Sequence, residues 1–128
     1  MRAVDTNIVV RLITRDDERQ AAAADRVVRD GAWLSIVAVS EVAWVLSQLY
    51  ELPRVQVADS IMLLLRHEHL TLEQAPAIEQ AVEVFRRTSG VSFADCLLIE
   101  VAKAQGVRPL ATFDKRLAKL DGTEIVTA

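Results

Sequence analysis

The sequence contains very little that would cross-link the chain or place it in a membrane. It has one cysteine, Cys96, so no internal disulfide can form, which suits a reducing cytoplasm. No secretory leader is expected, because Asp5 and Arg11 interrupt the apolar stretch at the start. Residues 32–50 carry a single charge, Glu41, but a carboxylate inside a membrane span costs about 2.5–3.5 kcal/mol. We therefore expect a cytoplasmic protein that does not associate with a membrane.

Several catalytic signatures are also absent. The chain has no G-x-S-x-G elbow, no P-loop and no G-x-G-x-x-G dinucleotide motif. The tract His67-Glu68-His69 has no thiol and no third histidine near it, so a designed metal site is not favoured there. Cys96 is more simply a small core residue than a nucleophile. Chemistry that depends on these motifs is therefore not predicted.

What is present is a composition typical of one globular domain. Of 128 residues, 52% are apolar and only 5% are aromatic, which predicts an aliphatic core in a single domain over residues 1–128. The net charge of −3 gives no general attraction for nucleic acid. If four of the acids surrounded a metal ion, however, the remaining surface would not repel a phosphate backbone.

Apolar spacing and turn residues predict helices that alternate with short strands. Gly31 and Gly106 are expected just past the ends of two helices. Alternation of this kind indicates an α/β fold with a parallel sheet covered on both faces. The expected strands are 2–5, 33–37, 69–72, 108–112 and 124–127. The expected helices are 6–13, 16–30, one after Val37 that runs to about Tyr50, one that Pro53 opens and that carries Val57, Ile61, Leu64 and Leu65, and then 77–88, 93–105 and 114–120.

Four acids fall just after strands or at the beginning of helices. Asp5 ends the first strand, Glu41 lies in the first turns of the helix after the second strand, and Asp114 follows the strand at 108–112. Asp95 lies in the first turn of the helix at 93–105. Because strand ends and helix beginnings share one edge of a parallel sheet, all four are expected to converge there.

Each of these acids also has a structural interpretation, which stays open. Asp5 and Asp114 are suitable N-caps, and Ser92-x-x-Asp95 has the pattern of a capping box. Glu41 sits where a helix dipole favours an anion.

Two observations favour a metal site over capping alone. Asp95 shares a helix face with Leu98 and Ile99. Glu41 lies one helical turn before Val45, beside the expected buried face of its own helix. An isolated buried carboxylate is costly, and several at one edge repel each other unless a cation lies between them. Oxygen ligands of this kind suit Mg²⁺ or Mn²⁺, which support phosphoryl transfer without a histidine or serine nucleophile.

Basic and aromatic residues give weaker signals. Arg86-Arg87 and Lys115-Arg116 are candidates for phosphate contacts, although such pairs are more often simply solvated. Trp33 and Trp44 are most simply core or interface residues.

Taken together, the acidic motifs resemble those of PIN-domain ribonucleases, and in particular of VapC-type toxins of bacterial and archaeal toxin–antitoxin pairs. The resemblance covers essentially the whole chain, and each motif alone is a weak signal. The matching stretches are Val4-Asp5-Thr6-Asn7, Ser40-Glu41-Val42, Phe93-Ala94-Asp95 and Leu110-Ala111-Thr112-Phe113-Asp114.

The resemblance implies a PIN-like, three-layer α/β/α fold with a central parallel sheet of four to five short strands. It implies an endoribonuclease that uses Mg²⁺ or Mn²⁺, with Asp5, Glu41, Asp95 and Asp114 as catalytic metal ligands. Thr6, Asn7 and Thr112 match supporting polar positions. Because no acid follows Asp114 until Asp121, a fifth carboxylate ligand is not expected.

The resemblance also implies partners. Members of the family cleave RNA and are usually dimers held together by helices. A small antitoxin inhibits them, so a homodimer, or a heterotetramer or larger complex with a cognate antitoxin, is expected.

Two other functions remain open at this stage. One is a nuclease of the same fold that acts in RNA processing or on DNA. The other is a catalytically silent interaction module that keeps the fold. Cleavage assays on both nucleic acids, and a test for metal-induced thermal stabilisation, would separate the three.

Overall fold

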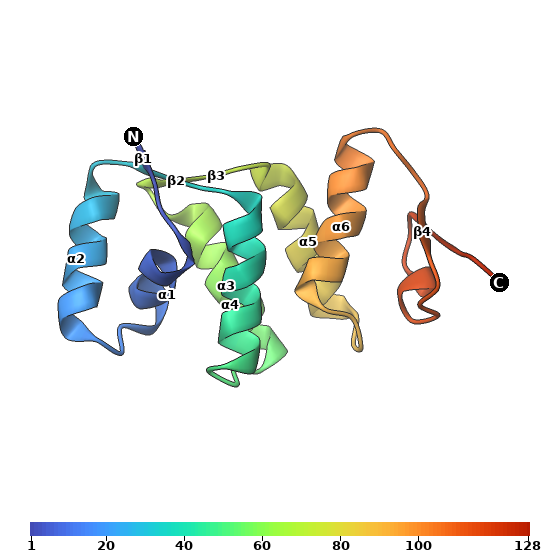
Figure 1. Ribbon diagram of the computed structural model, residues 1–128, viewed down its shortest axis with the longest axis horizontal. Coiled ribbons are helices and arrows are strands. Elements are labelled where there is room, and N and C mark those ends of the chain that lie inside the picture. The colour runs from blue at the N-terminus through green and yellow to red at the C-terminus, as the bar shows by residue number, and fades with distance from the viewer. The chain divides into compact units, whose positions relative to one another are not determined.

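The structure, a computed structural model, describes residues 1–128 and consists of alternating helices and short strands (Figure 1). The chain forms two compact units, Met1–Ala75 and Pro76–Ala128, called here the first and the second unit. The first unit contains β1 (Arg2–Ala3), α1 (Thr6–Thr14), α2 (Glu18–Arg29), β2 (Ala32–Leu34), α3 (Ile36–Gln48), α4 (Arg54–Arg66) and β3 (Leu70–Leu72). The second contains α5 (Ala75–Arg87), whose first residue closes the first unit, α6 (Phe93–Ala104), β4 (Leu110–Thr112), the 3₁₀ helix η1 (Leu117–Lys119) and β5 (Thr123–Ile125).

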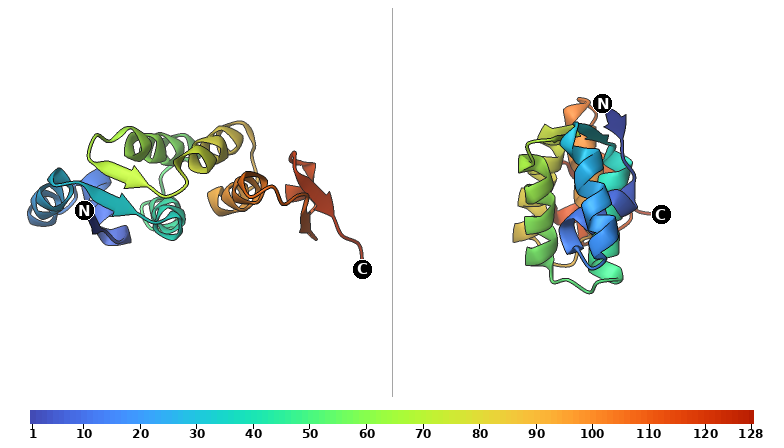
Figure 2. Two further views of the ribbon diagram at one scale, coloured as in Figure 1. Left: turned by 90° about the horizontal axis from the view of Figure 1, so that it is seen from above. Right: turned by 90° about the vertical axis from the view of Figure 1, so that its left-hand side faces the viewer.

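The first unit is built on a parallel sheet of three strands. The strand order is β1-β2-β3, with Ala3 paired to Trp33 and Leu34 paired to Leu72. Helix α4 lies beside β3, and α1 follows β1 at the opposite edge of the sheet (Figure 2). The core of the unit is aliphatic: Val9, Leu34, Val39, Leu46 and Ile61 have no exposed surface. This confirms the α/β class and the parallel pairing that alternation predicts.

The second unit has its own core and its own sheet. Strands β4 and β5 pair in parallel, with Ala111 opposite Glu124. Helices α5 and α6 are joined by an edge-to-face contact between Phe85 and Phe93, whose ring centroids are 5.7 Å apart. Leu117 of η1 is also buried. The five strands therefore match the expected number, but they form a three-stranded and a two-stranded sheet.

Local capping explains the helix ends. Helix α6 ends in a Schellman motif, in which Val107 N–H donates to Ala102 O at 3.0 Å and Gly106 N–H donates to Lys103 O at 2.9 Å. Gly106 has φ of +72°, the left-handed conformation that glycine adopts without steric cost. None of the helices has the length and the apolar composition that a membrane-spanning segment needs.

Three expected elements differ in the structure. The first strand was expected over 2–5, but β1 ends at Ala3, so Asp5 lies beyond the strand and caps α1. Residues 33–37 were expected as one strand, but β2 ends at Leu34, and Ser35 caps α3 by accepting from the N–H of Ala38 at 3.1 Å. The β-branched residues that follow Ser35 therefore begin a helix. The expected helix at 114–120 is only the three-residue η1.

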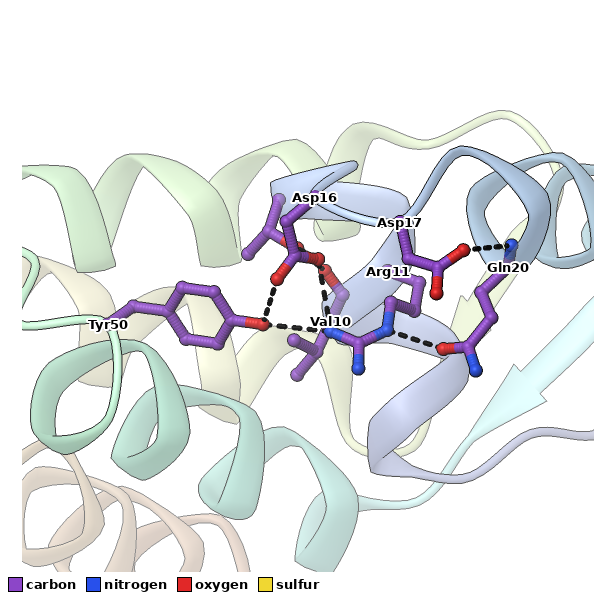
Figure 3. Close-up of polar contacts among 7 residues, drawn as sticks. Val10, Arg11, Asp16, Asp17, Gln20 and Tyr50 are labelled. Atoms are coloured by element: carbon purple, nitrogen blue, oxygen red, sulfur yellow. Dashed lines mark hydrogen bonds and ion pairs between the residues drawn. The ribbon is translucent and has the colours of Figure 1, made fainter.

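A polar network ties α1 to the ends of α2 and α3 (Figure 3). Arg11 donates to the Tyr50 hydroxyl at 2.9 Å, to Asp16 Oδ1 at 3.0 Å and to Gln20 Oε1 at 2.6 Å. Tyr50 in turn donates to Asp16 Oδ2 at 2.8 Å, and Thr14 donates to Asp16 Oδ1 at 2.7 Å. The hydrogen bonds from Thr14 and Tyr50 lower the pKa of Asp16 below its ordinary value.

This network should make stability depend on acid pH. A carboxylate whose pKa is lowered on folding adds stability above its unfolded pKa, and this contribution is lost as pH falls through the folded pKa. We expect Asp16→Asn to lower the melting temperature at pH 7, and the difference from wild type to shrink near about pH 3. Thermal unfolding at both pH values measures this, with Asp30→Asn, an exposed aspartate outside the network, as control. An equal loss at both pH values would contradict the role of the ionised form.

Candidate functional site

Asp5 lies between β1 and α1 and is the N-cap of that helix. Its Oδ1 accepts from the N–H of Ile8 at 3.2 Å. Asp5 therefore caps the helix, as the structural interpretation predicts. The capping hydrogen bond occupies only one carboxylate oxygen, and Oδ2 makes no hydrogen bond within the chain. An exposed carboxylate held in this way keeps an oxygen available for a cation.

The next residue connects Asp5 to the second candidate acid. Thr6 Oγ1 donates to Glu41 Oε2 at 2.6 Å, across 35 positions of sequence. Helices α1 and α3 pack against each other, and this brings the first turn of α1 to the second turn of α3. Glu41 Oε1 is left without an intramolecular partner. The structure therefore groups Asp5, Thr6 and Glu41 at one place in the first unit, as the sequence predicts.

A hollow opens beside Asp5 in the first unit. It has a volume of about 690 Å³ and lies between β1, α1 and α2. Asn7, a predicted supporting residue, borders it, as do Arg11 one turn further along α1 and Gln20 of α2. Sequence analysis missed Arg11 and Gln20. The spacing of four residues between Asn7 and Arg11 was the available signal, because it places both on one face of α1.

In the second unit, Asp95 lies in the first turn of α6. Ser92 caps this helix, and its Oγ accepts from the N–H of Asp95 at 3.0 Å. The Asp95 carboxylate accepts no hydrogen bond in return, so only half of the expected capping box forms. This half-buried carboxylate is therefore not used by the cap.

Asp114 lies just after β4 and stabilises the turn that leads into η1. Its N–H donates to Thr112 Oγ1 at 2.9 Å. Its Oδ1 accepts from the N–H groups of Arg116 at 2.8 Å and Leu117 at 3.3 Å. As with Asp5, one oxygen fixes the backbone and Oδ2 stays free.

The structure connects two of the four predicted acids, Asp5 and Glu41, through Thr6. Asp5 and Glu41 belong to the first unit, whereas Asp95 and Asp114 belong to the second. Within neither unit do three or more histidine, cysteine, aspartate or glutamate side chains come close enough to hold a metal ion. Convergence of all four acids therefore stays a prediction.

The burial arguments made for two of the acids do not hold. Leu98, expected on the buried face with Asp95, is 57% exposed, although Ile99 is only 1% exposed. Glu41 is exposed, and the buried side of α3 consists of Ala38, Val39, Val42, Ala43 and Leu46. The reason is that α3 and α6 carry apolar residues on nearly every side, so spacing alone does not identify the buried face.

The donor set nevertheless fits a hard divalent cation. Asp5, Glu41 and Asp114 each have one oxygen held by a hydrogen bond from the chain and one without a partner. Hydrogen bonds of this kind orient carboxylate ligands, and Mg²⁺ and Mn²⁺ prefer such oxygen donors.

The cysteine and the histidine tract have structural roles. Cys96 is completely buried in the second unit. His67 ends α4, and its Nδ1 accepts from the N–H of His69 at 3.1 Å, so the histidine tract forms a turn. Trp33 is half-buried, and Trp44 is 59% exposed on α3.

Comparisons to known proteins show the family to which the chain belongs. The family model of the PIN domain matches residues 2–123, so the chain belongs to the PIN domain family. Among curated proteins, it is 22% identical to the VapC ribonuclease of Aquifex aeolicus (strain VF5) over 125 residues. That match covers 94% of this chain and 92% of the relative.

A solved structure is also similar. It is the crystal structure of Mycobacterium tuberculosis VapC20, described as a Sarcin-Ricin loop cleaving toxin. The two chains are 19% identical with a TM-score of 0.44, and the match covers 95% of this chain and 96% of that one.

Proposed function

We propose that this chain is a divalent-metal-dependent endoribonuclease and the toxin component of a type II toxin–antitoxin system. Membership of the PIN domain family supports nuclease chemistry. Similarity to a VapC ribonuclease over 94% of this chain supports RNA as the substrate and an antitoxin as the partner.

The observation that carries the proposal is the state of the four carboxylates. Asp5, Glu41 and Asp114 are each oriented by a hydrogen bond through one oxygen while the other stays unpartnered, and Asp95 has both oxygens unpartnered. Caps alone would not require Glu41 to be bound by Thr6 across 35 positions. In the proposal, these four residues together hold Mg²⁺ or Mn²⁺, and Thr6, Asn7 and Thr112 support them.

The chain's own residues would prepare the site for hydrolysis. When bound, the metal polarises a phosphate oxygen and lowers the pKa of a coordinated water. Ile8 N–H fixes the orientation of Asp5, and the Thr6 hydroxyl keeps its proton directed at Glu41 Oε2. Thr112 and the N–H groups after Asp114 hold that carboxylate on a rigid turn. Pre-orientation of this kind reduces what must be reorganised during the reaction.

The proposal includes a homodimer that works in the cytoplasm and assembles with a cognate antitoxin as a heterotetramer or a larger complex. Helices α3 and α4 pack against each other and expose Val37, Trp44, Val55 and Leu63. Large exposed apolar side chains on adjacent helices are typical of surfaces that bind another protein. They support a dimer held by helices.

Cleavage assays test the proposed activity. We expect the purified chain to cut single-stranded RNA with Mg²⁺ or Mn²⁺, to fall to background in EDTA, and to recover when excess metal is added. Single-stranded and duplex DNA of the same sequence serve as matched substrates. Cleavage that survives EDTA would contradict the metal site, and cleavage of DNA alone would contradict a ribonuclease.

A further inference from the structure

Arg116 lies two residues after Asp114, and its backbone is bound to that acid. Its N–H donates to Asp114 Oδ1 at 2.8 Å, so the two residues form one turn. The Arg116 side chain, however, does not pair with the carboxylate. It forms no ion pair or side-chain hydrogen bond in the structure, and it is exposed.

The side chain instead crosses the loop that leads into α6. A Cβ atom placed on Gly90 would lie 3.5 Å from Arg116 Cδ and 3.9 Å from Arg116 Nη1. Gly90 has φ of +81° and is exposed, so no side chain separates the guanidinium from this loop. Arg116 therefore packs on the segment that immediately precedes the Ser92 cap.

Arg116 is connected to both acids of the second unit through short stretches of chain. Four residues separate Gly90 from Asp95, and the last two of them lie in the first turn of α6. On the other side, Arg116 is bonded through its backbone to Asp114. Arg116 is thus linked to Asp114 through its backbone and to the loop before Asp95 through its side chain, and its guanidinium pairs with neither carboxylate.

The charge balance of the second unit fits binding of an anion there. The unit contains seven basic and seven acidic residues. When Asp95 and Asp114 are balanced by a cation, the remainder has a basic excess. A guanidinium presents planar paired donors that match phosphate oxygens, and it stays protonated at all relevant pH values.

We propose that Arg116 binds a backbone phosphate of the RNA substrate and holds the strand beside Asp95 and Asp114. This rests on the proposed ribonuclease function and adds a substrate-contacting residue to it. The contact is with phosphate, so it is independent of base sequence. It affects binding of the strand more than the chemical step.

Steady-state cleavage of a fluorogenic single-stranded RNA, measured at several KCl concentrations, tests this. We expect Arg116→Met to raise KM about tenfold while kcat changes less than threefold, and to reduce the salt slope of kcat/KM by about one. Arg116→Lys should recover part of the loss in KM, because it keeps the charge without the planar donors. Arg108→Met, an exposed arginine before β4, is the matched control and should behave as wild type.

Further measurements distinguish failure of the Arg116 inference from failure of the proposed ribonuclease function. The thermal shift that Mg²⁺ produces should be the same in Arg116→Met and wild type, because Arg116 is not a metal ligand. An unchanged KM and salt slope in Arg116→Met would overturn the inference while leaving the ribonuclease intact. A fall in kcat, with a lost thermal shift, would also overturn it. A wild-type chain that cuts no RNA would instead overturn the proposed function.

Discussion

Replacing Asp5 by asparagine will reduce RNA cleavage at least about a hundredfold while the protein stays folded. Asparagine is as good an N-cap as aspartate, so the hydrogen bond from Ile8 N–H is retained. What is lost is the negative charge on Oδ2, the oxygen that the cap does not use. Cleavage rates with saturating Mg²⁺, together with the melting temperature, measure the two roles separately.

Asp17 provides a matched control for this substitution. It is the N-cap of α2, and its Oδ1 accepts from the N–H of Gln20 at 3.0 Å, three residues on, just as Asp5 accepts from Ile8. Asp17→Asn should therefore leave both stability and cleavage unchanged. If Asp5→Asn also cleaves at the wild-type rate, Asp5 is only a cap and the four-carboxylate site is wrong.

Capping signals explain why much of the fold could be predicted from the sequence. The end of α6 at Ala104 follows from Gly106, whose left-handed conformation completes the Schellman bonds. Gly31 ends α2 for the same reason, with φ of +87°. These are local effects of one residue type on its own backbone, so neighbouring residues are sufficient to reveal them.

The start of α3 could not be predicted in this way. The β-branched residues at 36 and 37 favour a strand, whereas the structure begins a helix at Ile36. Two caps decide the outcome: Ser35 binds Ala38 N–H, and Glu73 accepts from Ile36 N–H at 2.9 Å. The second cap comes from a residue 37 positions away, so it depends on the pairing of β2 with β3.

The candidate site shows the same difference between local signals, which the sequence reveals, and long-range contacts, which it does not. The four acids are candidates because of their place after strands and at helix starts. The contacts that orient them could be identified only in part: Thr112 lies two residues from Asp114, but the Thr6–Glu41 hydrogen bond spans 35 positions. Such a contact depends on how α1 packs against α3, and apolar spacing on α3 does not specify that packing.

Replacing Phe93 by alanine is expected to cost about 3–5 kcal/mol in the free energy of unfolding and to abolish cleavage. Phe93 is 4% exposed and begins α6, and its ring contacts Phe85 of α5 edge to face. The substitution removes a large buried side chain and this aromatic contact together. Asp95 lies two residues further in the same helical turn, so loss of this anchor would also release a candidate ligand.

Urea unfolding of the variants separates packing from chemistry. Phe93→Leu keeps most of the apolar volume, and should retain most of both stability and cleavage. Asp95→Asn supplies the opposite case, because it removes a ligand charge while leaving the Phe85–Phe93 contact in place. We therefore expect stability to fall in the order Asp95→Asn, Phe93→Leu, Phe93→Ala, and cleavage to survive only in Phe93→Leu.

If Phe93→Ala cost less than about 1 kcal/mol in the free energy of unfolding, the aromatic contact would not hold α6. Asp95 lies in the first turn of α6, and the Ser92 cap and the ring of Phe93 fix that turn. The position of Asp95 therefore depends on both contacts.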